Sequence, residues 1–201
     1  MFRQFLTLFL LFSSLLGCGE VKVGSTLCSL AAYSRVNTGD EIGIGFTDYG
    51  GSSLVQPFVV TADGTATSVV VQLSVVGSFT ANVSTLTATI ESNSAGKPDG
   101  VPLATARTID PASLSTTSAT AVFSFVTPPT LTSGTQYWLR IKASYPLSTT
   151  KYVKWSGFNG VSGRYSSGGV KLQAFYETGT PGVYNNSLIG DDQFFVFNIG
   201  C

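Results

Sequence analysis

The sequence contains no histidine among its 201 residues, which removes the most common general acid and base from every candidate mechanism. Ser-His-Asp triads and histidine-ligated catalytic metals are therefore excluded. The chain also lacks a Gly-x-Ser-x-Gly nucleophile elbow and a phosphate-binding glycine loop. The adjacent carboxylates Asp40-Glu41 and Asp191-Asp192 would point to opposite faces of a strand, which does not suit a glycosidase pair. The sequence therefore predicts a protein that is not an enzyme.

Charged residues are also scarce, at 11% of the chain, and eleven basic residues balance eleven acidic ones. A chain without net positive charge has no electrostatic attraction for nucleic acid, so we expect no nucleic-acid partner. Serine, threonine, glycine and valine are abundant instead, which is typical of a secreted β protein.

The N-terminal segment has the composition of an export signal. Arg3 supplies a positive charge, and the uncharged run from Phe5 to Leu16 is shorter than the roughly 20 residues that a membrane-spanning helix needs. The run ends in Leu15-Leu16-Gly17-Cys18, which resembles the lipobox of bacterial lipoprotein signals. Residues 1–17 are thus predicted to be removed, and Cys18 to carry acyl chains such as palmitate that hold the protein on a lipid bilayer.

Two readings of this signal remain open, because an ordinary secretory signal followed by a chance cysteine fits the same residues. Under the lipoprotein reading, Gly19 follows the lipidated cysteine where an inner-membrane retention signal would have Asp. The predicted location is therefore the outer membrane or the cell surface.

Lipidation of Cys18 leaves two of the three cysteines, Cys28 and Cys201, at opposite ends of the mature chain. In an oxidising compartment such a pair predicts an intramolecular disulfide. The alternatives are two unpaired thiols, or a bond from Cys201 to a partner. A zinc site is not indicated, since there is no Cys-x-x-Cys motif and no histidine.

Residues 18–40 are predicted to form a lipidated N-terminus and tether, and residues 41–201 an all-β domain. Short apolar runs bounded by turn residues indicate its strands. They are Leu54 to Val60, Thr67 to Val76, Thr85 to Glu91, Ala119 to Val126, Gln136 to Tyr145, Tyr152 to Trp155, Val170 to Tyr176 and Gln193 to Ile199. Lys97-Pro98-Asp99-Gly100 is expected to be a β-turn. We predict an antiparallel, jelly-roll-like β-sandwich.

Alternation along these runs assigns side chains to faces. The predicted inward set comprises Leu86, Ala88, Ile90, Ala121, Phe123, Phe125, Tyr137, Leu139, Ile141 and Ala143. The intervening positions are expected to be mostly solvated, as on antiparallel sheets with one wet face.

Several segments together resemble the choice-of-anchor R domain of bacterial surface proteins. They are Leu54 to Phe58, Ser68 to Leu73, Lys97 to Ala106, Leu131 to Trp138, and Asp191-Asp192-Gln193-Phe194. The resemblance runs from about Gly45 to Ile199. It implies a jelly-roll-like domain similar to carbohydrate-binding modules, with Tyr184 at a position where relatives often carry tryptophan.

The candidate ligand-binding residues are aromatic rings beside cations. Trp138 shares its parity with Arg140 and Lys142, and Trp155 shares its parity with Lys151, so both rings are expected on solvated faces. Flat rings beside hydrogen-bonding side chains suit sugar recognition. The alternative is that each ring packs under a loop or stacks on its own cation.

Tyr184, with Tyr165 and Tyr176, is a candidate for the rim of the same site, the alternative being ordinary loop packing. Asp191 and Asp192, or Asp48 with loop carbonyls, are candidate ligands for a structural Ca²⁺, which requires hard oxygen donors; no other cofactor is expected. These observations favour a membrane-anchored binding module for glycans or another extracellular ligand. The alternative is a structural envelope or assembly domain with no small-molecule ligand, which burial of both tryptophans would favour.

Overall fold

The computed structural model describes residues 29–33, 41–47, 51–159 and 197–201, together with the short strands at 166–167, 170–171, 175–177, 184–185 and 193–195. Nearly all of these elements are strands, and a short 3₁₀ turn, η2 (Pro111–Ser113), lies among them. Within the described ranges, no helix has the length and hydropathy needed to cross a membrane.

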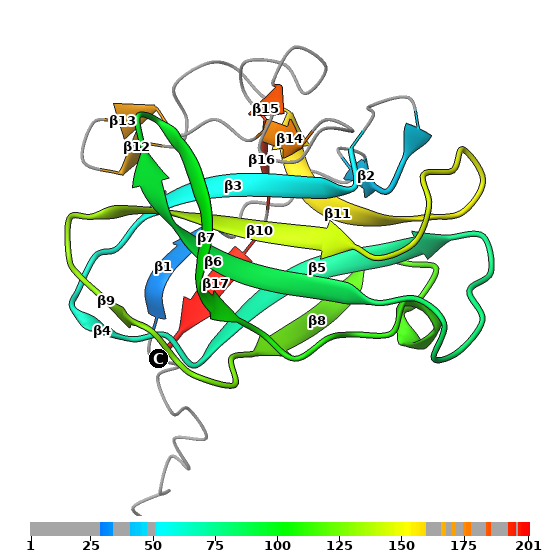
Figure 1. The fold of residues 1–201 in the computed structure, drawn as a ribbon, viewed down its shortest axis with the longest axis horizontal. Helices are drawn as coiled ribbons and strands as arrows, with labels where there is room; N and C mark the ends of the chain where they lie inside the picture. Colours follow the sequence, from blue (N-terminus) through cyan, green and yellow to red (C-terminus); the bar gives the residue numbers. More distant parts are fainter. Residues whose placement is uncertain are drawn as a thin grey trace, which may run out of the picture.

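Most of the strands belong to two antiparallel sheets (Figure 1). One sheet contains β1 (Ser29–Tyr33), β2 (Glu41–Ile44), β5 (Ser68–Val76), β8 (Ala119–Ser124), β11 (Tyr152–Asn159), β16 (Gln193–Phe195) and β17 (Phe197–Gly200). The other contains β3 (Ser53–Val59), β6 (Leu86–Ser94), β7 (Lys97–Thr105), β10 (Gln136–Ala143), β14 (Phe175–Glu177) and β15 (Tyr184–Asn185). Two small pairs lie outside them, β4 (Gly64–Thr65) with β9 (Thr130–Leu131) and β12 (Ser166–Ser167) with β13 (Val170–Lys171).

The first sheet is organised around β5, and we call it the β5 sheet. Val69 of β5 pairs with Phe123 of β8 and also with Ile199 of β17, so these two strands lie on opposite edges of β5. Farther along the same strand, Leu73 pairs with Trp155 of β11. One edge of β5 is therefore shared by β17 and β11.

The second sheet is organised around β10, and we call it the β10 sheet. Its order is β15-β14-β3-β10-β6-β7, with β3, β10 and β6 side by side across the molecule (Figure 1). Leu139 of β10 pairs with Gln56 of β3 and with Ile90 of β6, which fixes the register of all three strands.

The inward faces of the two sheets form one hydrophobic core. The buried positions include every residue of the predicted inward set: Leu86, Ala88, Ile90, Ala121, Phe123, Phe125, Tyr137, Leu139, Ile141 and Ala143. The all-β antiparallel sandwich and its inward face are thus confirmed. Side chains at alternate positions face the core because the strand repeat is two residues.

Part of the predicted tether belongs to the domain, which corrects the boundary drawn at residue 41. Strand β1 pairs with the C-terminal strand β17, and its residues Leu30 and Ala31 are buried in the core. The five residues of β1 are a weak sequence signal for a strand, because the run is short and contains no β-branched residue. They form a strand because the C-terminal strand lies beside them and pairs with them.

The predicted turn at Lys97-Pro98-Asp99-Gly100 is also wrong, because these residues begin strand β7. The chain reverses one step earlier, where Ala95 and Gly96 have φ values of 50° and 78°. Two consecutive positive φ values suit the tight turn of a hairpin. β7 tolerates its prolines because it is the edge strand of its sheet and pairs with β6 through an irregular register.

Candidate functional site

Both tryptophans are buried, so the expectation that they lie on solvated faces is wrong. Trp155 is fully buried in the main core, beside its strand partners Ile42 and Leu73. Trp138 is 1% exposed and forms a second buried cluster with Val55 on the outer face of the β10 sheet. Its indole nitrogen donates a hydrogen bond to Asn93 Oδ1 at 3.0 Å. Neither ring is available as a stacking platform.

The two errors have different physical causes. Lys151 lies in the turn before β11 begins, so its parity says nothing about the face of Trp155. Trp138 was assigned to the correct face, but that face is itself buried at β3, where the outward residues Ser53, Val55 and Pro57 are inaccessible. Alternation assigns a side chain to a face and does not say whether water reaches that face.

A pocket of about 330 Å³ opens on this outer face, at the β6, β7 and β10 side of the sheet. Its lining residues are Thr87, Thr89, Glu91, Gly100, Pro102, Arg140, Lys142, Ala143 and Ser144. Glu91 and Arg140 are buried, whereas Lys142, Ser144 and Pro102 are exposed. The pocket therefore has a charged but buried floor and an accessible polar rim.

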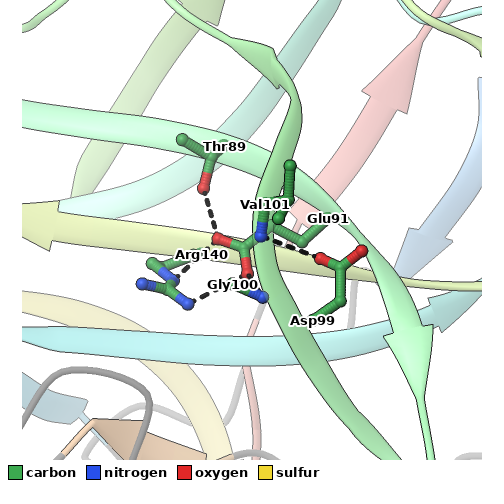
Figure 2. A network of polar contacts seen from close by, with 6 residues as sticks. All are labelled: Thr89, Glu91, Asp99, Gly100, Val101 and Arg140. Atoms are coloured by element: carbon green, nitrogen blue, oxygen red, sulfur yellow. Dashed lines mark hydrogen bonds and ion pairs between the residues drawn. The ribbon is translucent and has the colours of Figure 1, made fainter.

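The floor is an ion pair held by further hydrogen bonds (Figure 2). Arg140 Nη2 donates to Glu91 Oε2 at 2.9 Å, and Arg140 Nε lies 2.9 Å from Glu91 Oε1. The Thr89 hydroxyl donates to Oε1 at 3.1 Å, and the Gly100 backbone N–H donates to Oε2 at 3.2 Å. Oε2 thus accepts two hydrogen bonds and Oε1 accepts one, while Arg140 Nε contacts Oε1 as part of the ion pair without a hydrogen bond. The Gly100 contact fixes the β7 backbone over the floor of the pocket.

The rim presents hydrogen-bond donors. Ser144 Oγ accepts from the backbone N–H of Thr85 at 2.8 Å and from its hydroxyl at 3.0 Å. With its oxygen so engaged, the Ser144 hydroxyl has its own proton to donate. The Lys142 ammonium, on the same rim, can only donate.

A second polar cluster lies on the β5 sheet. Lys154 Nζ donates to Glu41 Oε2 at 3.0 Å, and Ser74 and Ser156 donate to Glu41 Oε1 at 3.3 and 3.4 Å. The Ser156 and Ser118 hydroxyls lie 2.6 Å apart. These groups satisfy one another and give the cluster a structural role.

Of the candidate ligand-binding residues, the structure brings Arg140 and Lys142 together at the pocket. Trp138 and Trp155 do not line it. Tyr184 begins strand β15, and only its backbone is described. The calcium candidates Asp191 and Asp192 lie outside the described residues, within which no group of three or more metal-ligating side chains occurs.

Of the three cysteines, the structure describes only Cys201, at the C-terminal end. Cys201 is disulfide-bonded, and the two other cysteines, Cys18 and Cys28, lie outside the described residues. Ser29, the residue after Cys28, pairs with Gly200, the residue before Cys201. That register supports the predicted Cys28–Cys201 pairing, which stays a prediction.

Sequence reasoning missed Glu91, Thr87, Thr89 and Ser144 as site residues. The strand containing the first three was recognised, but their outward face was expected to be solvated. A buried carboxylate needs a partner, and Arg140 on another strand was available in the sequence. Nothing in the sequence showed that β6 and β10 are neighbours, so the pair could not be assembled.

Comparisons of this chain with protein-family models, with curated proteins and with solved structures give no match. The resemblance to the choice-of-anchor R domain therefore stays a prediction that depends on the quoted segments alone.

Proposed function

We propose that this chain is an exported lipoprotein whose β-sandwich is a non-catalytic binding module. The observation that carries the proposal is the pocket on the β10 sheet, which combines a rigid charged floor with an exposed rim of donors. Pockets with a few convergent polar groups are the usual sites of small-molecule recognition. A glycan end is a suitable ligand, because its hydroxyls match such a rim.

The lack of histidine and the engaged state of the pocket carboxylate support a binding role. The sequence has no histidine, and the carboxylate in the pocket, Glu91, already accepts three hydrogen bonds and is paired with Arg140. A carboxylate so occupied is a poor general base, because it must first lose its partners to accept a proton.

The membrane anchor is supported by the lipobox-like residues Leu15 to Cys18 after an apolar run. Metabolic labelling with a palmitate analogue tests it, because only the Cys18 thiol can take the lipid. The wild-type protein should be labelled and Cys18→Ser should not. Persistent label on Cys18→Ser would refute the lipoprotein assignment.

The second candidate function is a structural envelope or assembly domain without a small ligand. Burial of both tryptophans favours it, because the aromatic platform that many sugar-binding surfaces use is missing. The two candidates differ in whether the pocket is occupied.

A glycan array probed with the detergent-solubilised full-length protein separates them. We expect binding by the wild type, loss of binding in Thr87→Tyr, which fills the pocket, and normal binding in Val122→Tyr. Val122 is a matched control because it is 52% exposed on β8, a strand of the other sheet. An empty array for the wild type, or equal binding by Thr87→Tyr, would reject the pocket as the functional site.

A further inference from the structure

We propose that the outer edge of β8 pairs with the same edge of a second copy of this chain, so that the β5 sheets of two protomers join into one continuous sheet. Within the described part of the chain, β8 pairs with β5 along one side and with no other strand along its opposite side (Figure 1). The pocket lies on the β10 sheet, so this inference does not depend on the proposed binding function.

The backbone of β8 turns hydrogen-bonding groups toward this edge. The Phe125 N–H donates to the chain just before β5, and the Ser124 C=O of the same peptide group points the opposite way and accepts from the Arg107 N–H. The register between β5 and β8 is unbroken, so the direction of the peptide groups alternates regularly along β8. The N–H and C=O groups of Thr120 and Val122 therefore face away from β5. Both residues are exposed.

The edge of β8 lacks the features that protect the edge of the other sheet. β7 contains Lys97, Pro98, Asp99 and Pro102, and its register with β6 is irregular. Charges, prolines and bulges prevent an edge strand from pairing with another chain. β8 has the sequence Ala-Thr-Ala-Val-Phe-Ser, without a charge, a proline or a register shift. Its edge is therefore suited to strand addition.

The side chains of β8 suit a second copy of the same strand. In an antiparallel pair centred on Ala121, Thr120 lies opposite the partner's Val122, which is a pair of β-branched residues. On the inner face, Ala119 lies opposite the partner's Phe123, a small side chain beside a large one. β8 carries no charge, so the copy brings no like charge against it. The pairing covers Val122, which is 52% exposed in the single chain.

The length of the available edge matches this register. β8 begins at Ala119, and Arg107 already occupies the edge at Ser124. A partner strand centred on Ala121 that also begins at Ala119 ends opposite Phe123, before it reaches Arg107. The contact uses the same residues on both protomers, so it closes into a two-fold dimer and does not continue into a fibre.

Sedimentation velocity of the detergent-solubilised full-length protein, over a range of concentrations, measures the association. We expect a monomer–dimer equilibrium for the wild type. Val122→Lys places two ammonium groups diagonally across the pair, within reach of each other, and should weaken the association at least roughly tenfold. Val101→Lys is the matched control, because Val101 is a 64% exposed valine on the edge strand of the other sheet, and it should associate like the wild type.

A charge swap separates a broken contact from a damaged fold. Val122→Glu alone should associate as weakly as Val122→Lys, because it also brings like charges together. An equal mixture of the two variants should associate at least roughly tenfold more tightly than either variant alone, because the charges are then opposite. Thermal melts of both variants should match that of the wild type, as expected for an exposed position.

Three results would overturn the inference. They are a wild type that stays monomeric at every concentration, a dimer that Val122→Lys leaves unchanged, and a mixture that associates no better than its components. The first result is also what an edge reserved for a strand of another protein would give. The glycan array with Thr87→Tyr tests the binding module separately, so a failed dimer leaves the binding module standing.

Discussion

The two sheets carry the same kind of ion pair in different surroundings. On the β10 sheet, Arg140 and Glu91 have side-chain exposures of 10% and 1%. On the β5 sheet, Lys154 and Glu41 have exposures of 32% and 22%. Water screens the Lys154–Glu41 pair and hardly reaches the Arg140–Glu91 pair. The two interaction energies therefore differ although the N–O distances of the two ion pairs are similar.

The β10 sheet differs from an antiparallel sheet that has one buried face and one solvated face. Its outer face contains a buried tryptophan and a buried salt bridge, both held by hydrogen bonds from neighbouring strands. A buried charge is tolerated only when it is paired and its remaining bonds are made. The pocket floor therefore resembles a polar core, and its rim is the part that a ligand can use.

Removing Glu91 should produce the largest effect. Glu91→Ala leaves the Arg140 charge buried without its carboxylate, and we expect a loss of about 3–5 kcal/mol in the free energy of unfolding. Urea denaturation of the full-length protein in detergent measures this loss. The double variant Glu91→Leu with Arg140→Met is the control, since it removes both charges and should recover most of the stability. A loss below about 1 kcal/mol in Glu91→Ala would mean that the pair behaves as a surface pair.

Trp138 tests whether the outer face of the β10 sheet is a true second core. Trp138→Ala should lower the free energy of unfolding by about 3–5 kcal/mol, as expected for a buried ring. Val122→Ala, at an exposed position, should change it by less than about 0.5 kcal/mol. Thermal melts of both variants give the comparison. Equal melting temperatures would contradict the burial of Trp138.

The sequence predicted which side chains of the sheets face the core. On the outer face of the β10 sheet it predicted only two of the pocket residues, Arg140 and Lys142. Alternation along β6, β8 and β10 was enough for the inward faces, because it depends on local geometry alone. The buried pair of Glu91 and Arg140 depends on strand order and register, which join residues 49 positions apart in the chain. Arg140 and Lys142 were selected for their proximity to Trp138, and the structure keeps the two cations at the site without the ring.

The more exposed ion pair, between Lys154 and Glu41, should contribute little to the stability of the fold. Lys154→Ala removes the cation beside Glu41, and we expect a loss of about 0–1 kcal/mol in the free energy of unfolding. Ser74 and Ser156 still donate to the Glu41 carboxylate in that variant, which limits the cost. Urea denaturation alongside Glu91→Ala places the two ion pairs on one scale. A loss as large as that of Glu91→Ala would remove the distinction between the two faces.

The smallest effect concerns the carboxylate of Asp110, which lies at a partly buried position near the surface. Asp110 accepts hydrogen bonds from the backbone N–H groups of Asn82 and Ala112, which lower its pKa below the ordinary value of 3.8. A lowered pKa in the folded state means that the charged form stabilises the fold above pH 4 or so, and that this contribution is lost as the pH falls through the folded-state pKa. Asp110→Asn cannot ionise, so its stability deficit relative to the wild type should shrink as the pH is lowered from 6 to 2. Unfolding free energies of both proteins across that range measure the trend, and a deficit that stayed constant with pH would show that the charge of Asp110 contributes nothing.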